Sequence, residues 1–179
     1  METNFSPMLD ALKADGPAAD RVEHMALYGW LIGAWDVEVL DRDANGAIRS
    51  ARGEWHFDWV LEGRAIQDVF IVPRRTERQS AGMAIAGNRY GTTLRVPNPE
   101  DGTWRIDWSN PVTQARSSMI ARKRDDEIVQ DGIGADGVPY RWIFSEISDD
   151  AFHWRAEVSS DEGRGWTTLT EFRAIRATA

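Results

Sequence analysis

Apolar and polar side chains alternate along most of this chain. From Trp35 onward, apolar residues recur at every second position, and turn sequences interrupt the alternation roughly every 8–12 residues. A period of two places successive side chains on opposite faces of an extended strand, so the pattern predicts about ten strands. They are expected at residues 34–41, 48–61, 65–72, 88–96, 103–109, 114–123, 127–132, 140–148, 152–159 and 166–176.

The connections between these strands are short. Asn45-Gly46, Glu62-Gly63 and Asp136-Gly137 are tight-turn sequences, and links of this length cannot hold the crossover helices that parallel strands need. Closing an antiparallel meander into a barrel also removes its two exposed edges. We therefore predict an all-β fold, a single antiparallel up-and-down barrel. Only residues 73–87 form a longer connection, which we interpret as a flap over an opening.

The first thirty residues follow a helical rather than a strand pattern. Ser6-Pro7 is suited to begin a helix that carries Met8 and Leu9 on its apolar face, and a second helix is expected to end near Tyr28-Gly29. A chain of 179 residues supports one domain. We predict a helical cap at residues 1–30 that partly covers the mouth of a barrel formed by residues 31–179.

Aromatic residues occupy one face of strand after strand. The set comprises Trp55, Phe57, Trp59, Trp104, Trp108, Tyr140, Trp142, Phe144, Phe152 and Trp154. Rings of this size belong in the interior, where they either fill the core or line a cavity. We favour a cavity, because a buried indole N–H needs a partner and a core built only for stability would use more leucine and isoleucine.

Polar residues among these strands are candidates for orienting a ligand. Strand 65–72 is apolar on both faces, so either Gln67 or Asp68 points inward. If Phe70 points inward, Asp68 is buried and must be paired or protonated, and Arg95 on the next strand is the nearest partner. Other polar residues that the alternation can place inside are Tyr90, Gln130 and Asp131.

A family resemblance supports the barrel. Gly33-Ala34-Trp35, at the junction of a helix and the first strand, resembles the glycine-any-tryptophan signature that opens lipocalins and other calycin barrels. Gly53-Glu54-Trp55 and the segment from Trp59 to Arg64 resemble uncharacterised lipocalin-like bacterial proteins of that superfamily. The likeness extends from about Leu27 to the C-terminus.

The resemblance implies a role for the signature tryptophan. It implies that Trp35 plugs the closed end of the barrel, with Arg173 or Arg176 packed on it. The lipocalin threonine-aspartate-tyrosine motif and a secretion signal are absent from the sequence, which argues against lipid transport between cells. Haem-binding relatives have alternating glycines where this chain has Val37 and Val39; if haem binds, His153 is the histidine to test.

Two further patterns have structural explanations. Residues 132–137 match the glycine fingerprint of dinucleotide-binding proteins, but a strand pattern follows them instead of the required helix, so we predict a hairpin. Glu54, His56 and Asp58 share one strand face and include metal-ligand types. Their aromatic neighbours require the interior, so we expect this charged set to face solvent and predict no metal site.

Charge and composition exclude several classes of function. Twenty-one basic against 29 acidic residues give a formal net charge of −8, without a basic block, which argues against nucleic acid and anionic membranes as partners. The lack of cysteine excludes disulfides and thiolate metal sites. We expect a cytoplasmic protein without a cofactor, and a homodimer is the default assembly.

Together these patterns predict a binding protein for a small apolar or aromatic molecule. The candidate ligand-binding residues are Trp55, Trp59, Asp68, Tyr90, Arg95, Trp104, Trp108, Trp142 and Trp154. A cofactor-independent cyclase, isomerase or hydratase could use the same cavity, with Asp68 or Tyr90 as acid or base. Haem binding, or a filled barrel that takes no ligand, is also compatible with these patterns. No residue set has the spacing of a known catalytic site.

Overall fold

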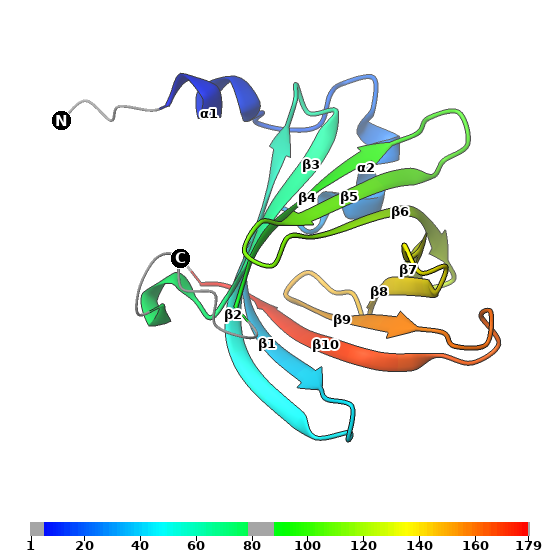
Figure 1. Cartoon of the computed structure of the whole chain (residues 1–179). Helices are drawn as coiled ribbons and strands as arrows, with labels where there is room; N and C mark the ends of the chain where they lie inside the picture. The colour runs from blue at the N-terminus through cyan, green and yellow to red at the C-terminus, as the bar shows by residue number, and fades with distance from the viewer. Residues whose placement is uncertain (1–5, 79–87, 179) are drawn as a thin grey trace.

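The fold consists of two short helices followed by ten strands (Figure 1). The structure is a computed structural model and describes residues 6–78 and 88–178. The elements are α1 (Pro7–Leu12), α2 (Val22–Gly29), β1 (Gly33–Arg42), β2 (Ile48–Val60), β3 (Ala65–Val72), the 3-10 helix η1 (Arg75–Glu77), β4 (Arg89–Pro97), β5 (Trp104–Asn110), β6 (Ala115–Arg124), β7 (Glu127–Ile133), β8 (Pro139–Ser145), β9 (Ala151–Val158) and β10 (Thr167–Arg176).

The ten strands form one closed antiparallel barrel. Each strand pairs with its neighbours in sequence, and β1 pairs with β10 to complete the circle. The predicted all-β meander is confirmed. No helix within the described part of the chain is long and apolar enough to cross a lipid bilayer.

The alternation of side chains separates an interior from an outer surface. Trp55 and Phe57 of β2 are buried, whereas His56 between them lies on the outer face. On β3 the buried inward residues include Asp68 and Phe70, which settles the register that the sequence left open. The inward rings of the strands form one continuous apolar cluster with residues of α2, so the predicted aromatic interior is confirmed.

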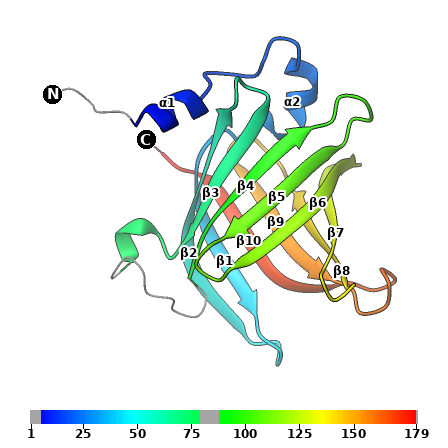
Figure 2. The same cartoon turned by 45° about the horizontal axis from the view of Figure 1, so that its top comes forward.

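Helix α2 closes one end of the barrel (Figure 2). Its residues Met25 and Tyr28 are fully buried, and the Tyr28 ring meets the Trp104 ring edge-on with centroids 4.9 Å apart. The chain passes almost directly from α2 into Gly33, so the helix must lie at the end where β1 begins. The expectation that the helices cover the mouth is therefore wrong, because the open pocket described below lies at the other end.

Trp35 and Arg176 pack against each other at this closed end. The Trp35 side chain is fully buried, and its Nε1 donates a hydrogen bond to the Leu31 carbonyl at 2.7 Å. The Arg176 guanidinium lies 4.2 Å from the centroid of the Trp35 ring and donates to the carbonyls of Trp30 and Ile32, each at 3.0 Å. The packing implied by the calycin resemblance is present, with Arg176 as the basic residue.

The glycine-rich segment 132–137 forms the predicted hairpin. It joins β7 to its antiparallel partner β8, with the Gly134 N–H bonded to the Val138 carbonyl at 2.8 Å. Gly137 has a φ of 81°, a conformation that favours glycine. The other long segment, predicted as a flap, includes residues 79–87, which lie outside the described residues.

Candidate ligand-binding site

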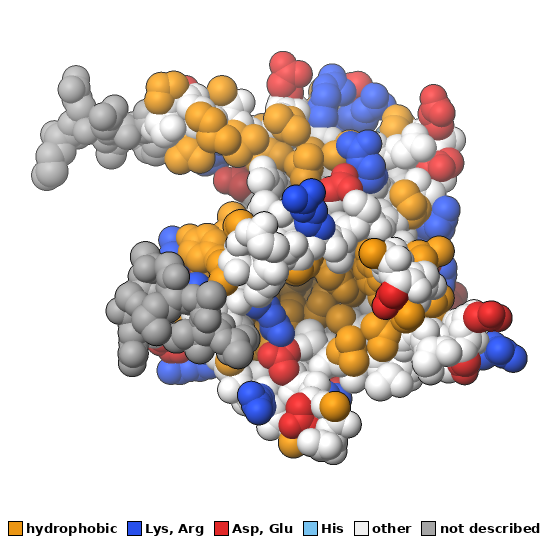
Figure 3. Space-filling model, viewed as in Figure 1, with side chains coloured by type: hydrophobic (Ala, Val, Ile, Leu, Met, Phe, Trp, Pro, Cys, Tyr) orange, Lys and Arg blue, Asp and Glu red, His pale blue; other side chains and the backbone are white. Residues whose placement is uncertain are grey.

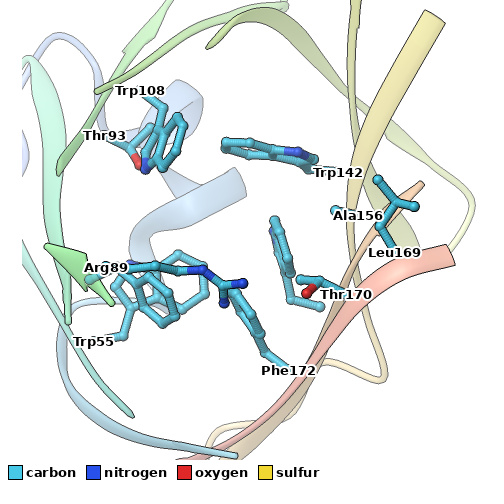
Figure 4. Close-up of a pocket in the computed structure, with 11 residues that line it drawn as sticks. Trp55, Arg89, Thr93, Trp108, Trp142, Ala156, Leu169, Thr170 and Phe172 are labelled. Carbon is cyan, nitrogen blue, oxygen red and sulfur yellow. The ribbon is translucent and has the colours of Figure 1, made fainter. Parts of the chain in front are cut away.

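An apolar pocket of about 280 Å³ lies inside the barrel at the end opposite α2. Figure 3 shows hydrophobic side chains at the bottom of the hollow in this face, and Figure 4 shows the pocket in close-up. Its walls are formed by Trp55, Phe70, Arg89, Thr93, Trp108, Trp142, Trp154, Ala156, Leu169, Thr170 and Phe172.

The aromatic walls of the pocket support one another. Trp154 stacks on Phe172 with ring centroids 4.2 Å apart, and the ring centroid of Trp142 lies 5.4 Å from that of Trp154. Trp142 in turn meets Trp108 edge-on at 5.5 Å. Because each ring is held by another ring from a different strand, the pocket has a defined shape before any ligand enters. Figure 4 shows Trp108 and Trp142 facing Trp55 and Phe172 across the space.

Arg89 is the one charged residue among those that line the pocket. Its Nη2 donates to Asp41 Oδ1 at 2.6 Å, whereas its Nη1 is buried without a hydrogen-bond partner in the part of the chain that the structure describes. The same holds for the indole Nε1 atoms of Trp55 and Trp154. Residues that line the pocket thus carry three N–H donors for which the described chain supplies no acceptor.

The structure divides the six tryptophans among the predicted binding residues into two groups. Those that line the pocket are Trp55, Trp108, Trp142 and Trp154. Trp59 and Trp104 also point into the barrel, but they lie at its closed end, beside Gly29 and Tyr28 of α2. They contribute to the core beneath the helix rather than to the pocket.

Asp68 and Arg95 form the predicted ion pair. Both side chains are buried, Arg95 Nη1 donates to Asp68 Oδ2, and the Thr93 N–H donates to Asp68 Oδ1 at 3.1 Å. The Arg95 guanidinium also lies 5.5 Å from the centroid of the Tyr28 ring. The pair therefore sits deep in the barrel toward α2, and neither residue lines the pocket.

Tyr28 is a buried phenol beside this ion pair. Its hydroxyl has no hydrogen-bond partner within the described ranges. Burial raises the pKa of Tyr28 above its ordinary value, although the positive charge of Arg95 acts in the opposite direction. The phenol is therefore held in its neutral form. Gln130 is also buried inside, as the alternation allowed, whereas Asp131 points outward and pairs with Arg124.

Two sequence-based candidates lie on the outer face of the barrel. Tyr90 is 40% exposed, with the Arg78 guanidinium 5.4 Å from its ring centroid. Its inward neighbour on β4 is Gly91, so Tyr90 cannot reach the interior. His153 alternates with the inward Trp154 and lies 3.4 Å from Glu171. Both interior roles, an acid or base at Tyr90 and a haem ligand at His153, are therefore wrong.

Glu54 and His56, two of the three outward residues on β2, form a cluster with Arg75. Glu54 accepts hydrogen bonds from the backbone N–H and the Nε of Arg75, both at 2.8 Å, and lies 2.9 Å from His56 Nε2. Chiefly through the Arg75 side chain, these bonds lower the pKa of Glu54 from 4.5 to about 2. No group of three or more metal-ligating side chains is found in residues 6–78 and 88–178.

Sequence reasoning did not identify several residues of the pocket. Phe70 and Phe172 follow the strand alternation and could have been found by extending the aromatic face to β3 and β10. Arg89 is the first residue of β4, directly after the long connection. Its inward direction follows from the same alternation, counted backward from Gly91. The inward positions at the start of β4 hold no large apolar residue from which the sequence could identify the inner face.

Comparison with known proteins supports the fold. No protein-family model and no curated protein matches the sequence. The S-type phycobiliprotein lyase CPES from Guillardia theta is similar in structure, with a TM-score of 0.57, 10% identity, and coverage of 91% of this chain and 99% of that chain. Rv2717c from M. tuberculosis gives a TM-score of 0.54 at 10% identity, covering 87% and 98%. These likenesses show the fold alone, a closed antiparallel β-barrel of ten strands.

Proposed function

We propose that this protein binds one small hydrophobic or aromatic molecule in the pocket of the barrel. The observation that carries the proposal is an open-ended pocket of about 280 Å³ with aromatic walls. Small-molecule sites are typically concave and mostly apolar, with a few polar groups that fix orientation. An engineered cavity of ~150 Å³ binds benzene, so this pocket has room for a ligand of two fused rings.

The division of the interior favours a binding site over an incompletely packed core. At the closed end, Trp35, Trp104 and Tyr28 are packed with no more than 2% exposure. At the opposite end, the aromatic side chains surround a space instead of filling it. A sequence that packs large rings so densely at one end does not need a void at the other for stability, because voids cost packing energy.

The composition of the pocket favours binding over catalysis. Its walls hold no carboxylate, histidine or tyrosine among the described residues, and the guanidinium of Arg89 can donate hydrogen bonds but has no acceptor atom. The acid and base candidates of the enzyme hypothesis, Asp68 and Tyr90, lie outside the pocket. The structural similarity to a phycobiliprotein lyase does not indicate which ligand this chain binds. The proposal depends on the residues of this chain.

A dye titration tests the proposed function. Prodan is an uncharged two-ring dye whose emission moves to shorter wavelength in an apolar site. We expect saturable, one-to-one binding with a blue shift, and loss of at least tenfold in affinity for Ala156→Phe, which places a ring in the pocket. Ala135→Phe, on the exposed hairpin between β7 and β8, is the matched control and should bind as the wild type. Binding that does not saturate, or is equal in both variants, would contradict the proposal.

A further inference from the structure

We propose that the ligand is an uncharged aromatic carbonyl compound, with the carbonyl oxygen accepting a hydrogen bond from Arg89. This inference rests on the proposed function and narrows the chemical class of the molecule. A ketone, quinone, lactone or lactam on two fused rings belongs to this class.

Residues that line the pocket carry hydrogen-bond donors without a partner in the described chain. Arg89 Nη1, Trp55 Nε1 and Trp154 Nε1 are all buried without an acceptor among the described residues. Buried N–H groups in folded proteins nearly always have a hydrogen-bond partner. Three donors on residues that line one pocket are therefore available to an acceptor on the molecule that fills it.

The walls of the pocket are poor in hydrogen-bond acceptors. Apart from the threonines, the side chains around the space are hydrocarbon, indole or guanidinium groups. The Thr170 hydroxyl already donates to Asp41 Oδ1. The walls thus offer few acceptors to a ligand that carries N–H or O–H groups. A ligand with an oxygen acceptor on an apolar body is the better complement.

The charge of Arg89 is already compensated inside the protein. Asp41 is bound to Arg89 Nη2 at 2.6 Å, so its carboxylate compensates the guanidinium charge. A ligand carboxylate at Arg89 would lie close to Asp41, and like charges at that distance repel. A neutral carbonyl can bind Nη1 while Asp41 keeps Nη2. Arg89 lies beside Phe172, 6.0 Å from its ring centroid (Figure 4), so a carbonyl there leaves the rings of the ligand among the aromatic walls.

Three naphthalenes substituted at the same ring position separate these contributions. Acetylnaphthalene has the neutral carbonyl, ethylnaphthalene keeps the two-carbon substituent without the oxygen acceptor, and naphthoate carries a charge. We expect acetylnaphthalene to bind the full-length protein about tenfold more tightly than either of the others, because a hydrogen bond from a charged donor has about this effect on affinity. Affinities are measured from the quenching of tryptophan fluorescence.

Variants of Arg89 identify the donor. In Arg89→Met, acetylnaphthalene and ethylnaphthalene should bind within twofold of each other, whereas Arg89→Lys, which keeps a donor, should retain part of the preference. Arg105→Met, on the outer face of β5, is the matched control and should keep the full preference. Asp41→Asn should shift the preference toward naphthoate, because Arg89 then has an uncompensated charge.

The outcomes distinguish this inference from the proposed function. If acetylnaphthalene and ethylnaphthalene bind the wild type equally well, the carbonyl assignment is overturned while the binding function stands. If naphthoate binds most tightly, the uncharged character is overturned. If none of the three binds, the proposed function itself fails. If Arg89→Met still prefers acetylnaphthalene over ethylnaphthalene, another group donates to the carbonyl and the role of Arg89 is overturned.

Discussion

Arg95 of β4 and Asp68 of β3 form an ion pair that is almost completely excluded from solvent, with side-chain exposures of 1% and 0%. The guanidinium lies 5.3 Å from the centroid of the Phe57 ring and 5.5 Å from that of Tyr28. A charge in such apolar surroundings is tolerated because its partner and the Thr93 N–H compensate it. The pair lies at the packed end of the barrel, next to Tyr28 of α2.

Removing one member of this pair should strongly destabilise the protein. Asp68→Leu leaves a buried, uncompensated guanidinium, which typically costs about 3–5 kcal/mol. The double variant Asp68→Leu with Arg95→Met removes both charges and should recover much of that loss. Urea unfolding followed by circular dichroism measures both. If the single variant loses less than about 1 kcal/mol, the pair does not have the structural role assigned to it.

Arg176 should stabilise the closed end without affecting ligand binding. Arg176→Met removes the cation–π contact with Trp35 and the hydrogen bonds to the carbonyls of Trp30 and Ile32, which together should cost about 2 kcal/mol. Arg173→Met, on the exposed face of the same strand, should change stability by less than about 0.5 kcal/mol. Thermal unfolding compares the two, and equal losses would contradict a specific role for Arg176.

Glu54 should make the stability of the fold depend on acid pH. Its pKa is about 2 in the folded protein, against an ordinary 4.5. A carboxylate whose pKa is lower in the folded than in the unfolded state stabilises the fold at pH values above its unfolded-state pKa. This contribution is lost as the pH falls from 4.5 toward 2. The free energy of unfolding of Glu54→Gln should therefore fall less steeply than that of the wild type in this range.

Glu62 provides the control for this pH dependence. Its side chain is 90% exposed, so Glu62→Gln should leave the slope of the wild type unchanged. Urea unfolding at a series of pH values measures the slope for all three proteins. Identical slopes for Glu54→Gln and the wild type would show that the Arg75 contact does not hold in solution.

The alternation of side chains was sufficient to predict the barrel and its aromatic interior. A period of two fixes which face of a strand Trp55, Trp142 and Trp154 occupy, whatever the rest of the chain does. The same rule made Asp68 and Arg95 partners once Phe70 was taken as buried. These inferences are local, which is why they were correct.

The sequence does not indicate where along the barrel axis an inward side chain lies. Trp104 and Trp108 share a face of β5, yet one packs beneath α2 and the other lines the pocket. Alternation identifies the inside of a barrel but does not indicate which end is open. That depends on where α2 docks, a long-range contact. Tyr90 was misplaced because a lone aromatic near the start of a strand gives too short a pattern to fix its face.

The central claim is that the tryptophans of one end of the barrel surround a guest molecule. The most direct test is the two-dimensional ¹H–¹⁵N NMR spectrum, in which each indole N–H gives its own signal, recorded during a titration with acetylnaphthalene. We expect saturable shifts of the indole signals of Trp55, Trp108, Trp142 and Trp154, whereas the signals of Trp35 and Trp104 at the closed end should not change. Shifts confined to tryptophans outside the pocket, or no saturable shift at all, would contradict it.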